Sequence, residues 1–420
     1  MRPGGVVAGA RPHTVVQLRE TRSLVRALRP PRCRLLQVST GVAMIGALVV
    51  LVALMSTTSS AVTAAERQWT CLPGTTPADL DRLFVSEPGG VVGADYQRTT
   101  PLPDGRVLWT FQDAEVRRPN GSTTLVHNIA MVQNANCFSV LIGGTAADPR
   151  PWLFSESTTP FVRWFWPLGA EVGVDGRVYV FAAEMYERSP GYLVRTEPTS
   201  TVVAVVDTAT WTVVGATAAP NPSTDLYGWS IESDSTWTYL FAQCHRQFGF
   251  DPYIFVFAHD QSCANRVTVG RVPKGQLLAA PTYWTGRGWS ADPAAAAPII
   301  ETSGRMVNAT QFVLSNNTWM AITKVDDWWG DRILVERAER AVGPYSVVAE
   351  IRANPRCPAD RCNTYFASWI PTSPGQLMFG MSHNQWNGVS SEFYRPSFTA
   401  VPAPVYTMSS AQRCSLGLCR

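Results

Sequence analysis

Apolar and polar residues alternate along most of the chain after residue 65, in short runs rich in Val, Thr, Trp, Tyr and Phe. Turn residues separate these runs at intervals of roughly eight to twelve positions, as in proteins built from short strands. No long stretch repeats its apolar residues at the 3.6-residue period of a helix. The pattern therefore predicts an all-β domain over residues 66–420, with helix only in short pieces such as Thr76 to Leu83.

One turn-and-strand pattern recurs five times along this domain. Its copies are DGRVLWTFQDAE (Asp104 to Glu115), DGRVYVFAAEMY (Asp175 to Tyr186), DSTWTYLFAQ (Asp234 to Gln243), NTWMAITKVD (Asn317 to Asp326) and PGQLMFGMSH (Pro374 to His383). Intervals of roughly sixty to eighty residues match the length of one four-stranded propeller blade. We therefore predict a single five-bladed β-propeller, with its chemistry where the blades converge.

The turn residue of each copy gives a common origin for comparing the five units. In the first unit, the positions nine before and nine after the turn residue are Asp95 and Asp113. The equivalent pairs in the other units are Trp166 and Glu184, Asp225 and Gln243, Asn308 and Asp326, and Tyr365 and His383. Antiparallel partners across a hairpin have a constant sum of residue numbers, so the first turn places Asp95 opposite Asp113, with Cβ atoms about 5 Å apart.

Two opposed carboxyl groups form a like-charge pair that stability alone would avoid, and their titrations are coupled. Glycosidases use such a pair, because one carboxyl stays protonated as the acid while its partner acts as base or nucleophile. We therefore take Asp95 and Asp113 as candidate catalytic residues. An ordinary solvated or turn-capping role is the alternative for each. Glu115 is a rival to Asp113, since a bulge between Phe111 and Glu115 would exchange which acid points inward.

Other residues are candidates for binding a sugar around the same funnel. Indole rings stack on sugar rings, which favours Trp166 and Trp229, although core packing is the simpler explanation for any single tryptophan. Glu184 and Asp225 occupy points on other units equivalent to those of the acid pair. Polar groups for sugar hydroxyls are predicted at His127, Asn128, Asn308, His383 and Asn384, each of which alone is more often structural.

The N-terminus has the features of an export signal. The first 34 residues carry eight arginines and one acid, and Val38 to Met55 then runs without a charge. A small-residue stretch, Ser56 to Ala65, follows and contains plausible cleavage sites, so residues 1–65 are interpreted as a secretory signal peptide. The apolar run 38–55 is also long enough to span a bilayer, and an uncleaved membrane anchor stays open. Either interpretation places the domain outside the cytoplasm, secreted or anchored.

Charge and cysteine content narrow the possible partners. Residues 66–420 contain 27 Lys and Arg against 31 Asp and Glu, so the overall charge of +3 becomes about −4 and no nucleic-acid partner is predicted. Eight cysteines in this part fit an oxidising compartment. Their spacing favours disulfides 357–362, 414–419 and 244–263, which leaves 71–137. We expect a monomer whose partner is a polysaccharide. We expect no cofactor and no zinc site, with calcium in the axial channel as an alternative.

The segment GADYQRTTPLPDGRVLWTFQDAE (Gly93 to Glu115) resembles the opening G-x-D…DGR…F-G-D signature of a family of secreted actinobacterial five-bladed β-propellers. That family was long filed as a domain of unknown function and is related to endo-D-arabinanase glycoside hydrolases. Similar segments continue to Asn384. The resemblance implies that Asp95 and Asp113 match the family's acidic pair and that cell-wall D-arabinan is the substrate.

Two positions depart from the family pattern. Gln112 stands where the family has Gly, which would narrow or reshape the cleft, and Asn308 stands where the larger arabinanase-like clan has a general-acid Glu. The sequence thus predicts an exported glycoside hydrolase that cleaves a furanose polysaccharide. Because of the two departures, a non-catalytic glycan-binding or cell-wall-associated propeller is the alternative.

Overall fold

The computed structural model describes residues 65–84, 90–158, 162–187, 196–221, 225–243, 248–251, 256–259, 266–300, 307–325, 330–353, 362–371, 376–385 and 394–402. Every described element belongs to the unit Ser59–Arg420. Residues 38–55, the predicted anchor or signal core, lie outside the described ranges. Within those ranges, no helix is both long enough and apolar enough to cross a bilayer.

Antiparallel sheets make up almost all of the described structure. The first sheet contains β1 (Ala65–Cys71), β2 (Val91–Ala94), β3 (Arg98–Pro101), β4 (Val107–Arg117), β5 (Thr123–Asn134), β6 (Cys137–Gly144) and β7 (Pro149–Arg150). Its strand order is β1-β6-β5-β4-β2, with β3 paired to β4 and β7 to β6. The second sheet contains β8 (Arg163–Val172), β9 (Val178–Glu187), β10 (Thr196–Val206) and β11 (Val213–Ala218).

The remaining sheets follow in chain order. The third contains β12 (Leu226–Ser233), β13 (Trp237–Gln243), β16 (Val267–Pro273), β17 (Thr282–Trp284) and β18 (Trp289–Ser290), and the separate pair β14 (Phe248–Asp251) and β15 (Val256–His259) lies in the β13–β16 connection. The fourth contains β19 (Val307–Ser315), β20 (Thr318–Val325), β21 (Arg332–Ala338) and β22 (Ser346–Arg352). The last contains β23 (Cys362–Ile370), β24 (Gln376–Gln385) and β25 (Ser397–Pro402). The helical pieces are α1 (Pro77–Leu80) and the 3₁₀ turn η2 (Pro293–Ala295).

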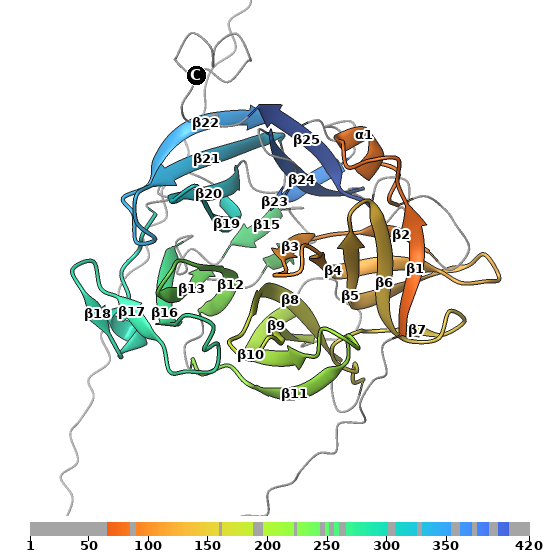
Figure 1. Ribbon diagram of the computed structural model, residues 1–420, viewed down its shortest axis with the longest axis horizontal. Helices are drawn as coiled ribbons and strands as arrows, with labels where there is room; N and C mark the ends of the chain where they lie inside the picture. The colour runs from red at the N-terminus through yellow and green to blue at the C-terminus, as the bar shows by residue number, and fades with distance from the viewer. Residues whose placement is uncertain are drawn as a thin grey trace, which may run out of the picture. The chain divides into compact units, whose positions relative to one another are not determined.

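The sheets are arranged around a common centre, as Figure 1 shows. Their inner strands contact one another in turn: β3 with β8, β8 with β12, β12 with β19, β19 with β23, and β23 again with β3. This closed ring is a β-propeller, and the predicted all-β class is confirmed. In the described residues four sheets have four or more strands and the one with β23 has three, so the blade count of five stays a prediction.

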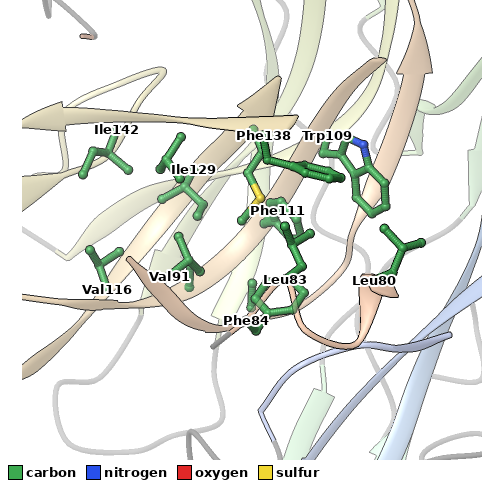
Figure 2. Close-up of a cluster of buried hydrophobic side chains, with 14 of the residues drawn as sticks. Leu80, Leu83, Phe84, Val91, Trp109, Phe111, Val116, Ile129, Phe138 and Ile142 are labelled. Atoms are coloured by element: carbon green, nitrogen blue, oxygen red, sulfur yellow. The ribbon is translucent and has the colours of Figure 1, made fainter. Parts of the chain in front are cut away.

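Large apolar side chains of the first sheet and of helix α1 pack together in one buried cluster (Figure 2). Trp109 and Phe111 of β4 pack with Phe138 of β6 and with Leu80 of α1, all of them at most 1% exposed. Thr76 caps α1 in a capping box with Asp79, which explains why a helix starts at this point. The helix is shorter than the predicted span to Leu83.

A disulfide between Cys71 and Cys137 joins β1 to β6 and confirms one predicted pairing. The side chains of the other predicted pairs lie outside the described residues.

The first hairpin forms at the predicted turn. Gly105 has a φ of +87°, which a residue with a side chain adopts only with strain, and the Leu102 amide donates to the Arg106 carbonyl across the turn. The inner strand of this hairpin is not continuous from Val91 to Pro101. It is interrupted between β2 and β3, where Tyr96 has a φ of +48° and its amide donates to the Ser382 hydroxyl of β24. The interruption lies next to Asp95.

Candidate active site

Asp95 and Asp113 are opposite each other in the first sheet, as the turn predicts. The Asp95 amide donates to the Asp113 carbonyl at 3.0 Å, and the Gln112 amide donates to the Asp95 carbonyl at 3.2 Å. The flanking pairs keep the same register, with Ala94 opposite Ala114 and Arg98 opposite Thr110. The residue numbers of each of these pairs sum to 208, so the pairing register is unchanged across the interruption of the inner strand.

The Asp95 carboxyl group is buried among polar partners from two sheets. Its Oδ2 accepts from the Tyr365 hydroxyl of β23 at 2.7 Å, and its Oδ1 accepts from the Asp113 amide at 3.1 Å. The residue is 7% exposed. Burial, together with the nearby charge of Asp113, raises the pKa of Asp95 to about 8, although hydrogen bonds from Tyr365 and Tyr394 oppose the shift. Asp95 is thus a carboxylic acid that keeps its proton at neutral pH.

The Asp113 carboxyl group has a different environment. Its Oδ1 lies 2.5 Å from Nδ1 of His127 on β5 and accepts from the Trp166 indole of β8 at 2.8 Å. Two donors on one oxygen stabilise a charged carboxylate. Among the described residues Oδ2 has no hydrogen-bond partner, and the side chain is 18% exposed. Asp113 therefore presents one free oxygen beside a protonated acid.

A change in side-chain parity along β4 gives Asp113 this orientation. Trp109 and Phe111 belong to the same buried cluster as Ala114 and Val116, so the inward-facing positions switch from odd to even numbers between them. Asp113 is consequently turned away from that cluster. Glu115, the rival acid, lies opposite Gly93 and Leu125, and burial raises its pKa. The acid that contacts Trp166 and His127 is Asp113.

His127 is held between Asp113 and an indole ring. It stacks on Trp164, with ring centroids 5.1 Å apart and an interplanar angle of 22°. Burial opposes the charged imidazolium, but the charge of Asp113 and the hydrogen bond to it outweigh burial and raise the pKa of His127. The pair therefore favours an imidazolium next to a carboxylate.

The structure brings His127 and Trp166 to the acid pair and places other predicted residues differently. Glu184 binds Arg163 at 2.8 Å and the Ser200 hydroxyl at 2.7 Å on the second sheet. Trp229 is 5% exposed, and its ring lies 4.7 Å from the Arg98 guanidinium. The expected stacking of a sugar on Trp229 would require the ring face that Arg98 covers to be exposed.

The predicted hydroxyl-binding residues are mostly buried. Asn128 is fully buried, where it donates to the Phe165 carbonyl at 3.1 Å and accepts from the Leu153 amide at 2.8 Å. His383 is also fully buried, so neither side chain has surface for a sugar in this conformation. Asn384, next to His383 on β24, is half-buried.

For the two remaining candidates, Asp225 and Asn308, the structure describes no side-chain contact with the acid pair. Asp225 is half-buried, and its carbonyl accepts from the Tyr227 amide just before β12. The side chain of Asn308 lies outside the described part, as do residues 326–329.

Residues that sequence reasoning did not choose complete the site. Tyr365 and Tyr394 bond to Asp95, Trp164 stacks on His127, and Arg98 lies on the strand beside them. Only Tyr365 had a signal, because it lies nine residues before its turn, as Asp95 does in the first unit. In the described ranges no group of three or more His, Cys, Asp or Glu side chains is arranged to hold a metal ion.

The ring of sheets and the acid pair define a β-propeller with a buried carboxyl dyad on its first sheet. The chain belongs to the family described as a domain of unknown function (DUF5005), whose model matches residues 78–404. It matches none of the curated proteins with which it was compared.

Solved structures support the fold. A candidate hydrolase from Bacteroides ovatus has a TM-score of 0.57 at 17% identity, over 81% of this chain and 94% of that one. A GH43 protein from Bacillus licheniformis has a TM-score of 0.44 at 12% identity, over 75% and 53% of the two chains. An endo-arabinase from Bacteroides thetaiotaomicron has a TM-score of 0.40 at 11% identity, over 74% and 94%. The first likeness supports the propeller fold, and the other two are too distant to carry an argument.

Proposed function

We propose that this protein is a glycoside hydrolase that cleaves a furanose polysaccharide, with cell-wall D-arabinan as the first substrate to test. The observation that carries the proposal is the contrast within one pair of carboxyl groups. Burial and the nearby charge of Asp113 raise the pKa of Asp95 to about 8, whereas Oδ1 of Asp113 has two hydrogen-bond partners and its Oδ2 has none among the described residues. Hydrolysis of a glycosidic bond by two carboxyl groups requires this division.

The contrast assigns a role to each acid. Asp95 supplies the proton to the leaving oxygen, and Asp113 acts through Oδ2 as base or nucleophile. The Trp166 indole and His127 hold Oδ1 and so fix the direction of the free oxygen. Choosing between base and nucleophile requires the stereochemistry of the product.

The test is hydrolysis of D-arabinan, L-arabinan and xylan by the purified protein, with product sizes measured by chromatography. We expect D-arabinan to be shortened, and we expect Asp95→Asn and Asp113→Asn to lower the rate by about a hundredfold or more. Asp104→Asn is the matched control, because Asp104 lies in the exposed turn of the same hairpin and bonds only to groups of that turn. Intact polysaccharides with the wild-type protein, or an active Asp113→Asn variant, would overturn the proposal.

A binding protein without catalysis is the second candidate. It is favoured by the engagement of Asp95, because both of its carboxyl oxygens already have partners and the residue is 7% exposed. This alternative predicts that the wild-type protein is retained on immobilised arabinan without releasing products. It also predicts that Asp113→Asn is retained equally well.

We further propose that the domain acts outside the cytoplasm as a monomer, either secreted or anchored through residues 38–55. The proposal is supported by the Cys71–Cys137 disulfide, which fits an oxidising compartment. N-terminal sequencing of the exported protein decides between the two forms. A start near residue 66 indicates cleavage, and an intact N-terminus in the membrane fraction indicates the anchor.

A further inference from the structure

Two buried donors meet at one backbone carbonyl beside the acid pair. The Pro167 carbonyl of β8 accepts long hydrogen bonds from Arg98 Nη1 at 3.3 Å and from Gln112 Nε2 at 3.4 Å. Pro167 directly follows Trp166, whose indole donates to Asp113. Gln112 directly precedes Asp113. The segments that carry Trp166 and Asp113 are therefore linked by a second hydrogen bond, between the neighbouring residues Pro167 and Gln112.

The first donor, Arg98, is a buried cation held by aromatic rings. Its guanidinium carbon lies 4.6 Å from the Phe366 ring centre and 4.7 Å from that of Trp229, and the residue is 5% exposed. Nη1 also donates to the Tyr96 carbonyl at 3.5 Å, immediately after Asp95. In the described part of the chain Arg98 forms no salt bridge, and its Nη2 has no hydrogen bond. Burial lowers the pKa of Arg98 to about 9, although Tyr96 and Asp95 oppose the shift. A buried cation without a salt bridge is costly, so stability alone does not explain this residue.

The second donor, Gln112, has a different role from the one expected. As a departure from the family's Gly, it was predicted to narrow or reshape the cleft. The structure buries it to 2% exposure, and its amide points to the neighbouring sheet. Pro167 lies at a register shift between β8 and β9, where the backbone departs from regular pairing. A side-chain donor at this point can fix a segment that the strand ladder leaves less constrained.

We propose that Arg98 and Gln112 are positioning residues, which hold the Pro167 carbonyl and thereby fix the Trp166 indole against Asp113. The free oxygen of Asp113 then keeps one direction relative to the acid Asp95. Misplacement of a reacting group by about 1 Å costs a large part of the rate. The kinetic part of this inference rests on the proposed function, whereas the indole contact does not.

The experiment compares Gln112→Met and Arg98→Lys with a matched control. Gln112→Met keeps the size of the side chain and removes its donor. Thr100→Val is the control, because the Thr100 hydroxyl donates to the Ala170 carbonyl at 3.3 Å and so joins β3 to β8, as Arg98 does, but away from the acids. The Trp166 indole N–H is identified in ¹⁵N–¹H spectra by its loss in Trp166→Phe.

We expect Gln112→Met and Arg98→Lys to shift the Trp166 indole resonance and to speed its hydrogen exchange about tenfold or more. We expect kcat on arabinan to fall about tenfold with KM changed less than about threefold, and Thr100→Val to match the wild type in every readout. Thermal unfolding checks that each variant is folded. If Arg98→Lys does not fold, Gln112→Met carries the test alone.

An indole resonance that stays at its wild-type position in Gln112→Met overturns the proposal. So does an equal loss of kcat in Thr100→Val, because that result would mean a general loosening between the two sheets. If the wild-type protein has no glycosidase activity, the proposed function is wrong. The indole resonance still tests whether Arg98 and Gln112 fix Trp166 against Asp113.

Discussion

Replacing Asp95 by Asn tests the buried acid through stability rather than activity. Asn has almost the same shape, can still accept from the Asp113 amide and can donate to the Tyr365 hydroxyl, but it does not ionise. The pKa of Asp95 is about 8 in the folded protein against an ordinary 3.8, so between these values the folded protein holds one proton more than the unfolded chain. This contribution therefore lowers the free energy of unfolding of the wild type as pH rises from about 4 to about 8.

The size of the effect follows from the shift. Each pKa unit corresponds to about 1.4 kcal/mol, so a rise from 3.8 to about 8 builds to on the order of 5 kcal/mol at pH 8 and roughly half of that at pH 6. The Asp95→Asn variant lacks this penalty and should gain stability over the wild type across the same range. Entry of water into the site would reduce the figure without changing its sign. Removing the charge of Asp113 should narrow the pH range over which the two proteins diverge, because that charge helps to raise the pKa of Asp95.

The assay is urea unfolding followed by tryptophan fluorescence at about pH 4.5, 6 and 7.5 and one ionic strength. Taking the difference between variant and wild type cancels the other titrating groups. Asp104→Asn is the control with a flat profile, since the hydrogen bond from Arg106 lowers the pKa of Asp104 and its charged form therefore contributes equally at all three pH values. A difference between Asp95→Asn and the wild type that stays flat or falls between pH 4.5 and 7.5 would refute the reasoning.

Three further predictions follow from single contacts. Replacing Cys71 and Cys137 by Ser opens a loop with a sequence separation of 66 and should lower the free energy of unfolding by about 4 kcal/mol, measured by urea unfolding. Tyr365→Phe removes a hydrogen bond that lowers the pKa of Asp95, so the alkaline limb of the kcat/KM profile on arabinan should move to higher pH; an unchanged limb contradicts this. Gly105→Ala should cost about 1 kcal/mol by thermal unfolding, because the φ of +87° is strained for Ala while the space around it is open; no loss would count against that turn geometry.

Local chemistry accounts for the parts of the site that could be predicted. An Asp-Gly turn fixes where a hairpin reverses, and strand pairing then fixes every partner along it, so Asp95 and Asp113 could be placed opposite each other from their residue numbers alone. The same comparison marked Trp166 and Tyr365 at equivalent positions of other units. Both contact the acid pair, because equivalent positions of neighbouring blades lie at one height around a closed ring.

Several predicted site residues have a side-chain environment that differs from the expected one. Asn128 and His383 were expected to face a sugar because they are polar, yet both are fully buried. Asn128 has a φ of +51° and bonds to two backbone groups, an arrangement that depends on a strand from another sheet. Gln112 was expected to narrow or reshape the cleft because it replaces the family's Gly, yet it is 2% exposed. Polarity alone does not distinguish a group that meets water from one that meets a buried carbonyl.

The repeated second strand of each unit, the first turn, the register of the first hairpin and the presence of two opposed acids follow from the sequence, because they depend on residues close in the chain. The chemical environment of those acids depends on the tertiary structure. The pKa of Asp95 is raised because the surrounding sheets bury it next to the charge of Asp113, and Asp113 is oriented by the hydrogen bond from Trp166 of the second sheet. Burial and donors of this kind come from distant segments that meet only when the ring of sheets closes.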